Sequence, residues 1–280
     1  MVNTGNSPRC SVVIATYNRA PVLAWAIRSV LAQSMSELEL LVIGDCCTDE
    51  SAEVVASFGD SRVHWHNLDK NAGHQYGPNN LGLRLARSAY VAYLGHDDLW
   101  LPGHLDALLP SLEDGAAFVH TSLAISIPDS ALKRLDRPPW WHRRPWVPPT
   151  CSAHPVERAL RVGGWPSPAD CRSVDPEVQL AWELTRPGGK RVHIPRLTAI
   201  KFPAAKRQNC YRDRSALEQG VWWDLIQKSA DPEARLAEVV RNNQPPVVPR
   251  ANTTPPLSGL KRTLERHKAK RRYKGLDSPT

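Results

Sequence analysis

The chain has 280 residues, a hydrophobic content of 41% and a formal net charge of +8. This length and apolar content suffice for a sizeable core in one large domain. The sequence contains no run of about 18 apolar residues, which excludes a spanning helix, and its first residues lack the order of a signal peptide. Its six cysteines show neither Cys-x-x-Cys nor zinc-finger spacing. We therefore expect free thiols in a reducing cytoplasm.

The basic charge is concentrated at the end of the chain. Residues 256–280 hold eight Lys and Arg against two acids, which accounts for most of the net charge. We expect residues 231–280 to form a linker and a basic tail. Anionic lipid would suit such a tail, so peripheral contact with the inner face of the membrane is one interpretation and a solvated terminus is the other. Nucleic acid is a weaker alternative.

Apolar, β-branched runs alternate with helical periodicity in the first part of the chain. The expected strands are residues 9–15, 38–43, 62–66 and 90–94, and helices are expected to begin near residues 21, 51 and 78. Strand and helix in strict alternation predict an α/β fold, with a mostly parallel sheet, flanking helices and right-handed crossovers.

Each of these four strands is followed by a polar cluster. The clusters are residues 16–19, Asp45, residues 67–73 and residues 96–98. Parallel strands end at one edge of a sheet, and open α/β sheets bind ligands at that edge, where the strand order reverses. The sequence therefore predicts one ligand site assembled from four separate segments.

Asp97 and Asp98 are adjacent carboxylates directly after the strand at residues 90–94. Mg²⁺ and Mn²⁺ favour one or two carboxylates together with phosphate oxygens, so a metal site is one interpretation. A solvated turn that caps the following helix is the other.

Five ordered motifs resemble those of family 2 glycosyltransferases, which have the GT-A fold. They are residues 11–19 (Ser-Val-Val-Ile-Ala-Thr-Tyr-Asn-Arg), 42–49 (Val-Ile-Gly-Asp-Cys-Cys-Thr-Asp), 71–73 (Asn-Ala-Gly), 79–82 (Asn-Asn-Leu-Gly) and 95–102 (Gly-His-Asp-Asp-Leu-Trp-Leu-Pro). The resemblance implies a single Rossmann-like, GT-A-like domain over residues 8–230. Its nucleotide-sugar-binding half would span residues 8–115 and its acceptor and catalytic half residues 116–230.

The same resemblance implies roles for individual residues. Ala15 and Tyr17 would line the nucleotide base, and Asp45 would accept a hydrogen bond from it. Asp97 would meet the ribose, and Asp98 would bind Mg²⁺ or Mn²⁺. Further candidates for donor binding are Thr16, Asn71, Asn80, His96, Lys201 and Arg207.

Two glycines depart from the family pattern, because Gly44 and Gly95 stand where many members have an acid. Simpler roles also remain open for several candidates. Tyr17 could cover a strand end, and Asn71 could make a turn. Asn80 could be an ordinary helix residue.

The second half resembles the family less closely, over about residues 163–195. Asp175 falls where the family keeps its general base, with Asp170 and Glu177 as competitors, and it could also cap the following helix. Lys201, Lys206 and Arg207 could neutralise a leaving diphosphate or form a solvated basic loop. The three tryptophans of residues 137–149 belong to a Pro-rich loop that could stack an acceptor sugar or pack on the body.

The expected reaction moves a sugar from a nucleotide-diphosphate donor of the UDP, GDP or dTDP type to an unknown acceptor hydroxyl, with inversion and metal assistance. A non-catalytic nucleotide-sugar-binding or scaffold protein on the same fold is the alternative. Gly44, Gly95 and the single acid at Asp175 keep that alternative open.

Overall fold

A computed structural model describes residues 7–136, 147–171, 174–186, 188–207, 209–213 and 215–248. Its first part alternates strands and helices as the sequence predicts. The strands are β1 (Cys10–Thr16), β2 (Leu38–Gly44), β3 (Val63–Asn67) and β4 (Tyr90–Gly95), and the helices are α1 (Ala20–Leu31), α2 (Ser51–Ala56) and α3 (Tyr76–Leu85).

Shorter elements make up the second part. Its strands are β5 (Leu99–Trp100), β6 (Phe118–Ile125), β7 (Lys133–Leu135), β8 (Ser152–Pro155) and β9 (Arg191–Lys201). Its helices are α4 (His104–Glu113), α5 (Val156–Arg161), α6 (Pro176–Thr185), α7 (Cys210–Asp213), α8 (Leu217–Gln227) and α9 (Pro232–Asn242), with 3-10 turns η1 (Pro149–Cys151) and η2 (Ala204–Lys206).

All the strands join one sheet in the order β3-β2-β1-β4-β8-β6-β9-β5, with β7 paired to β6. The pairs among β3, β2, β1 and β4 are parallel, which confirms the prediction for this half. The other half is mixed, because β8 runs antiparallel to both β4 and β6 while β9 runs parallel to β6. The order reverses between β1 and β4, which is the position where open α/β sheets bind ligands.

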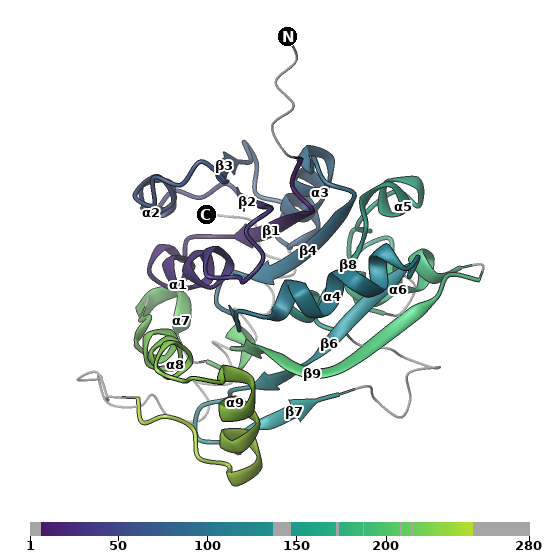
Figure 1. Ribbon diagram of the computed structural model, residues 1–280. Coiled ribbons are helices and arrows are strands. Elements are labelled where there is room, and N and C mark those ends of the chain that lie inside the picture. The colour runs from purple at the N-terminus through teal and green to yellow at the C-terminus, as the bar shows by residue number, and fades with distance from the viewer. Residues whose placement is uncertain are drawn as a thin grey trace.

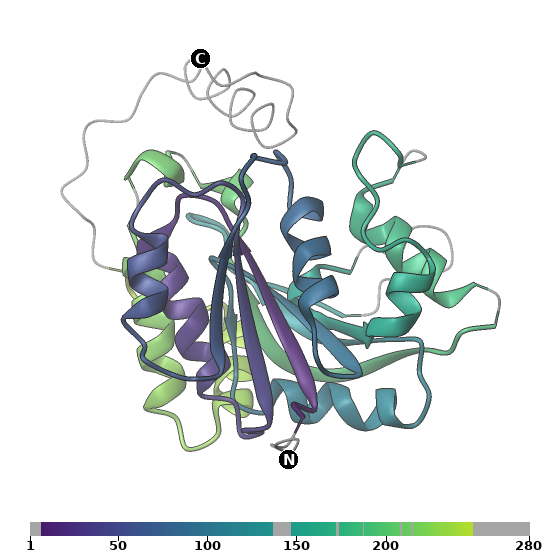
Figure 2. The same cartoon turned by 90° about the horizontal axis from the view of Figure 1, so that it is seen from above.

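Helices cover both faces of the sheet. Figure 2 shows α1 and α8 on one side of the strands and α3, α5 and α6 on the other. The central strands are apolar because both of their faces are covered, and every residue of β2 is buried. Pro21 lies in the first turn of α1, where its missing N–H leaves no helical bond unmade.

The folded domain extends beyond the expected boundary at residue 230. Leu236 and Val239 of α9 are buried in an apolar cluster with Trp222 of α8 and Phe202. Residues 232–242 are therefore part of the domain and not linker, since their apolar stripe closes this cluster. The predictions for residues 137–146 of the Trp-rich loop and for the basic residues from 249 onward lie outside the described residues. Within the described part, no helix combines the length and apolar character needed to cross a membrane.

Candidate active site

The ends of the parallel strands lie level with one another. The strands β3, β2, β1 and β4 lie side by side in Figure 1. In their register Thr16 pairs with Gly44, Gly44 pairs with Asn67, and Ala15 pairs with Gly95. This register brings the four polar clusters of the sequence to one edge of the sheet. The predicted assembly of one site from separate segments is therefore present in the fold.

Asp45 lies in a closed loop at the end of β2. Its side chain is 6% exposed, and Oδ1 accepts a hydrogen bond of 2.7 Å from the Ala72 N–H. Burial raises the pKa of Asp45, and the N–H groups of Ala72 and Gly73 act in the opposite direction. Asn71 donates to the Asp45 carbonyl at 3.0 Å and accepts from the Gly73 N–H at 2.6 Å. Asn71 thus fixes the loop that surrounds Asp45.

Tyr17 stands exposed beside this buried acid. Its side chain is 42% exposed, whereas the preceding Thr16 is buried and its carbonyl accepts the Asp45 N–H at 2.8 Å. An aromatic face in solvent next to a carboxylate suits a flat heterocycle that carries N–H donors. The role that the resemblance implies for Tyr17 and Asp45 stays a prediction.

Close packing explains why a glycine stands at position 44 in this chain. A Cβ at this position would collide with Asn67 Oδ1 and would lie 2.7 Å from the Trp65 ring. Asn67 fills the space and bonds to the main chain of Cys47, with N–H to Oδ1 at 2.8 Å and Nδ2 to carbonyl at 2.9 Å. An acid at position 44 would require this amide to move.

Asp98 is fully buried, and both of its carboxylate oxygens have protein partners. Oδ1 accepts the Phe202 N–H at 2.8 Å. Oδ2 accepts from the Thr150 hydroxyl and pairs with Lys201 Nζ at 3.0 Å. These contacts differ from the role of metal ligand that the resemblance implies for Asp98, because its carboxylate is already bound to one cation and two hydrogen-bond donors.

Gly95 permits this arrangement of Asp98. A Cβ at position 95 would lie 2.5 Å from Asp98 Oδ2 and 3.3 Å from Asp97 Oδ1. The Gly95 carbonyl accepts the Asp98 N–H at 3.0 Å, and its N–H donates to Thr150 Oγ1 at 3.3 Å. The acid that many family members have at this position would therefore displace the Asp98 carboxylate.

Asp97 is 8% exposed, and its main-chain carbonyl accepts from Gln219 of α8 at 3.3 Å. Burial raises its pKa first, and the charge of Asp98 adds to this, while His96, Lys201 and Arg19 lower it. Burial also lowers the pKa of His96. Asp97 is thus a buried acid beside Asp98, close to the strand end where the resemblance places the ribose.

Lys201 and Arg207 follow the same strand but have different surroundings. Lys201 ends β9 and reaches Asp98 because Leu99 of β5 pairs with the preceding Ile200. Arg207 forms a bidentate pair with Glu218, at 2.7 Å for the closest contact, and donates to the Ser126 carbonyl at 3.1 Å. Arg207 therefore joins the loop to α8 and is committed to protein partners, contrary to the donor-binding role expected for it.

Asn80 also has a structural role in place of the expected contact with the nucleotide. Its Nδ2 donates to the Trp165 carbonyl at 2.8 Å, and its Oδ1 accepts the Trp165 N–H at 2.8 Å. Both ends of the amide thus bind the Trp165 main chain, so Asn80 connects α3 to the turn that precedes the acceptor half.

Asp175 precedes α6 and is exposed, and no side-chain capping hydrogen bond is formed at this helix start. Its charge contributes, with those of Glu177 and Asp170, to a raised pKa of Cys171, after burial as the first cause. The three candidate bases therefore lie close together. In the described residues, no hydrogen bond or ion pair links Asp175 to the Asp97–Lys201 region.

The sequence did not single out Arg19 or Thr150. Arg19 is 2% exposed and lies within the polar cluster after β1, which was its only signal. Thr150 follows the Pro-rich segment and carries no motif, although its hydroxyl holds Asp98 and its carbonyl accepts Trp100 Nε1 at 2.6 Å.

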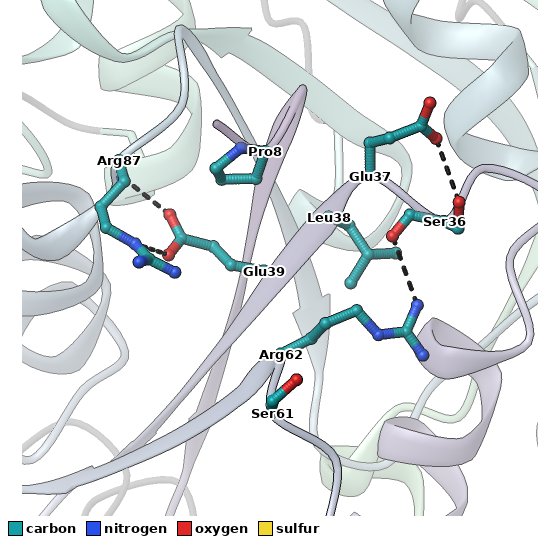
Figure 3. A pocket seen from close by; sticks show the side chains of 8 residues that line it. All are labelled: Pro8, Ser36, Glu37, Leu38, Glu39, Ser61, Arg62 and Arg87. Atoms are coloured by element: carbon teal, nitrogen blue, oxygen red, sulfur yellow. Dashed lines mark hydrogen bonds and ion pairs between the residues drawn. The ribbon is translucent and has the colours of Figure 1, made fainter. Parts of the chain in front are cut away.

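A shallow pocket lies at the opposite edge of the sheet, where the strands begin (Figure 3). Its lining includes Glu39, Arg62 and Arg87. Arg87 caps the Glu39 carboxylate with its main-chain N–H at 2.7 Å and its Nε at 2.6 Å. The polar groups there are paired with one another, so the strand-end site remains the candidate active site.

This fold and site define a GT-A-type α/β domain. Residues 11–155, more than half of the chain, match the model of the family described as "Glycosyl transferase family 2". The chain belongs to glycosyl transferase family 2, a family of enzymes.

Curated relatives agree with this assignment. The succinoglycan biosynthesis protein ExoO of Rhizobium meliloti is 34% identical over 110 residues, which cover 39% of this chain and 31% of ExoO. A GalNAc(5)-diNAcBac-PP-undecaprenol beta-1,3-glucosyltransferase of Campylobacter jejuni is 33% identical over 117 residues, which cover 40% of this chain and 37% of that enzyme. The chain thus matches only about a third of each relative's length.

Solved structures share the fold at low sequence identity. S. aureus TarS in complex with UDP-GlcNAc superimposes with a TM-score of 0.58 at 14% identity, over 84% of this chain and 71% of TarS. The mannosyltransferase PcManGT of Pyrobaculum calidifontis, in complex with GDP-Man and Mn²⁺, gives 0.56 at 17% identity, over 96% and 84%. The GT-A fold is therefore confirmed for the part of the chain that the structure describes.

Proposed function

We propose that this domain transfers a sugar from a nucleotide-diphosphate donor to an acceptor hydroxyl. The observation that carries the proposal is the convergence of exposed Tyr17, buried Asp45 and Asp97 at one edge of the sheet. The UDP-GlcNAc and GDP-Man bound to TarS and PcManGT support a donor of the UDP, GDP or dTDP type.

In this proposal each candidate residue has one role. Tyr17 stacks on the base, Asp45 accepts its N–H, and Asp97 accepts a ribose hydroxyl. Asp175 takes the proton of the acceptor hydroxyl while the hydroxyl oxygen bonds to the anomeric carbon, on the side opposite the diphosphate. The bond from the anomeric carbon to the diphosphate oxygen breaks, and its electron pair leaves with the diphosphate. This course inverts the anomeric centre.

A divalent cation is the cofactor that the family suggests, and Mn²⁺ accompanies GDP-Man in PcManGT. The residues present here do not fit such an ion well. Asp98 is occupied by Lys201, Thr150 and the Phe202 N–H, and Gly95 supplies no carboxylate. Among the described residues, no three His, Cys, Asp or Glu side chains are grouped to hold a metal. No step of the proposed reaction therefore passes through a metal.

The acceptor and the surroundings of the protein are proposed from chemistry alone. The acceptor presents a hydroxyl, which could belong to a small molecule, a lipid-linked glycan or a protein. The basic tail would meet anionic lipid at the inner face of the membrane, which agrees with a peripheral cytoplasmic enzyme better than with a nucleic-acid-binding protein.

Binding and turnover test the proposal separately. A thermal-shift screen with UDP-, GDP-, dTDP- and CDP-sugars should show a raised melting temperature for one nucleotide. Donor hydrolysis or transfer should then disappear in Asp175→Asn while donor binding persists. Binding without turnover under any acceptor would favour the non-catalytic alternative, and no binding at all would contradict the donor site.

A further inference from the structure

We propose that Arg19 and Lys201 supply the positive charge that holds the diphosphate of the donor, so that donor binding requires no divalent cation. The inference rests on the proposed function, because it concerns the same donor site. It arises from the poor fit of a metal to the residues around Asp98.

Lys201 lies against the carboxylate that the family resemblance assigns to the metal. Its Nζ is 3.0 Å from Asp98 Oδ2, and its side chain is 20% exposed while that of Asp98 is fully buried. The ammonium is thus the solvent-facing member of the pair. A phosphate oxygen that approaches this strand end meets the Lys201 cation before it meets the acid.

Arg19 is a second cation at the same edge of the sheet. Its guanidinium donates through Nη1 to the Cys210 carbonyl and lies 5.1 Å from the Tyr211 ring centroid. Its Nε is buried and has no hydrogen-bond partner, and no described carboxylate forms an ion pair with it. A buried N–H without an acceptor is costly, and no described ion pair joins Arg19 to the nearby Asp97, so this guanidinium can take a phosphate oxygen as an acceptor.

The two cations lie at the same corner of the sheet edge. Lys201 binds Asp98, and the Tyr211 ring lies 5.1 Å from the Arg19 guanidinium and 6.4 Å from the ring of His96, which is two residues before Asp98. Because Gly95 brings no carboxylate, two cations face two acids at this corner. The two acids balance the two cations in charge, but the Lys201 ammonium is partly exposed while Asp98 is fully buried, so an approaching diphosphate meets positive charge first.

The same charges serve the bond-breaking step. The diphosphate gains negative charge as the bond to the anomeric carbon breaks, and preorganised cations stabilise that charge without reorganisation. Arginine and lysine are suited to this task because both bind phosphate oxygens through charged N–H donors.

The test measures binding by calorimetry with UDP, GDP and dTDP and with the nucleosides uridine, guanosine and thymidine. Each titration is run in EDTA and in Mn²⁺ on the full chain. In the wild type, one diphosphate should bind in EDTA as tightly as in Mn²⁺, and more tightly than its nucleoside. The Arg19→Gln and Lys201→Gln variants should each lose about tenfold or more of this diphosphate advantage while nucleoside binding persists.

Two further variants guard against misfolding. Arg19→Lys keeps the charge and should retain part of the advantage, and Lys201→Gln combined with Asp98→Asn removes the cation without leaving a buried acid unpaired. Lys190→Gln, at an exposed lysine before β9, is the matched control and should change nothing. Diphosphate binding that requires Mn²⁺ would overturn the inference and leave the proposed function intact. Absence of binding by any diphosphate or nucleoside in both buffers would overturn both.

Discussion

Asn80 on α3 holds both main-chain polar groups of Trp165, which lies 85 residues further along the chain. The contact joins the nucleotide-binding half of the domain to the start of the acceptor half. Gly164 makes it possible, because its φ is +75° and a Cβ there would collide with Asn80 Oδ1. Asn80, a residue of the family motif at 79–82, thus connects the two halves of the domain through two hydrogen bonds.

The Asn80→Ala variant should lose about 2 kcal/mol of unfolding free energy, since two hydrogen bonds vanish and the Trp165 main chain loses its partners. Urea denaturation measures the change. Arg84→Ala, at an exposed position of the same helix, is the control and should stay within about 0.5 kcal/mol of the wild type. An Asn80→Ala variant of unchanged stability with weakened nucleotide binding would instead restore the ligand role.

Removing only Lys201 should destabilise the protein more than removing Lys201 together with the charge of Asp98. Lys201→Met leaves a fully buried carboxylate without its cation and should cost about 3 kcal/mol of unfolding free energy. Adding Asp98→Asn to that variant should recover part of the loss, because the uncompensated charge is gone. A double-mutant cycle in urea separates the coupling from the single effects. Additive losses would show that the two groups do not interact.

Gly95→Ala should destabilise the protein by about 1–3 kcal/mol, because the added methyl meets Asp98 Oδ2 at 2.5 Å in a packed site. Gly103→Ala is the matched control, since its nearest neighbour is the end of the flexible Arg196 side chain at 3.1 Å. Thermal unfolding of both variants compares them directly. Equal melting temperatures would mean that the Asp98 carboxylate can move aside at little cost.

The sequence predicted the sheet edge at which the first candidate residues lie, because the information for the strands is local. Apolar runs that end in polar residues define the strand edges, and parallel pairing brings Tyr17, Asp45 and Asp97 together. The neighbour of Asp98 could not be predicted in this way. Lys201 reaches it only through the pairing of β5 with β9, across 103 residues, and no periodicity encodes that pairing.

The same limit explains the other differences. Asn80 and Arg207 have polar side chains that suit a ligand in sequence, but distant groups, the Trp165 main chain and Glu218, use their hydrogen-bonding capacity. Residues 232–242 were expected to be linker, because the sequence does not show what their apolar side chains contact. In the structure, Leu236 and Val239 pack against Trp222 and Phe202. Long-range packing decided each of these cases.

Glu39 should contribute to the acid sensitivity of the fold. Burial alone raises its pKa, but hydrogen bonds from Ser11 and Arg87 lower it below its ordinary value. A carboxyl whose pKa is lower in the folded state stabilises the protein above its unfolded pKa and loses that contribution as the pH falls through its folded pKa. Between about pH 5 and pH 3, the wild type should therefore lose stability more steeply than Glu39→Gln, by roughly 1 kcal/mol. Urea midpoints across this range measure the slope, and parallel slopes would contradict the assignment.

Tyr17 offers the sharpest separation of binding from stability, because a ring that is 42% exposed contributes little to the core. Tyr17→Ala should weaken nucleoside binding by about tenfold, since stacking of a base on an aromatic ring is worth about 1–3 kcal/mol. The Tyr17→Phe variant keeps the ring and should bind like the wild type. Calorimetry with the preferred nucleoside, in EDTA, measures this loss apart from any effect on the diphosphate. If Tyr17→Phe lost as much nucleoside affinity as Tyr17→Ala, the hydroxyl and not the ring face would contact the base. If neither variant lost affinity, Tyr17 would not be part of the base site.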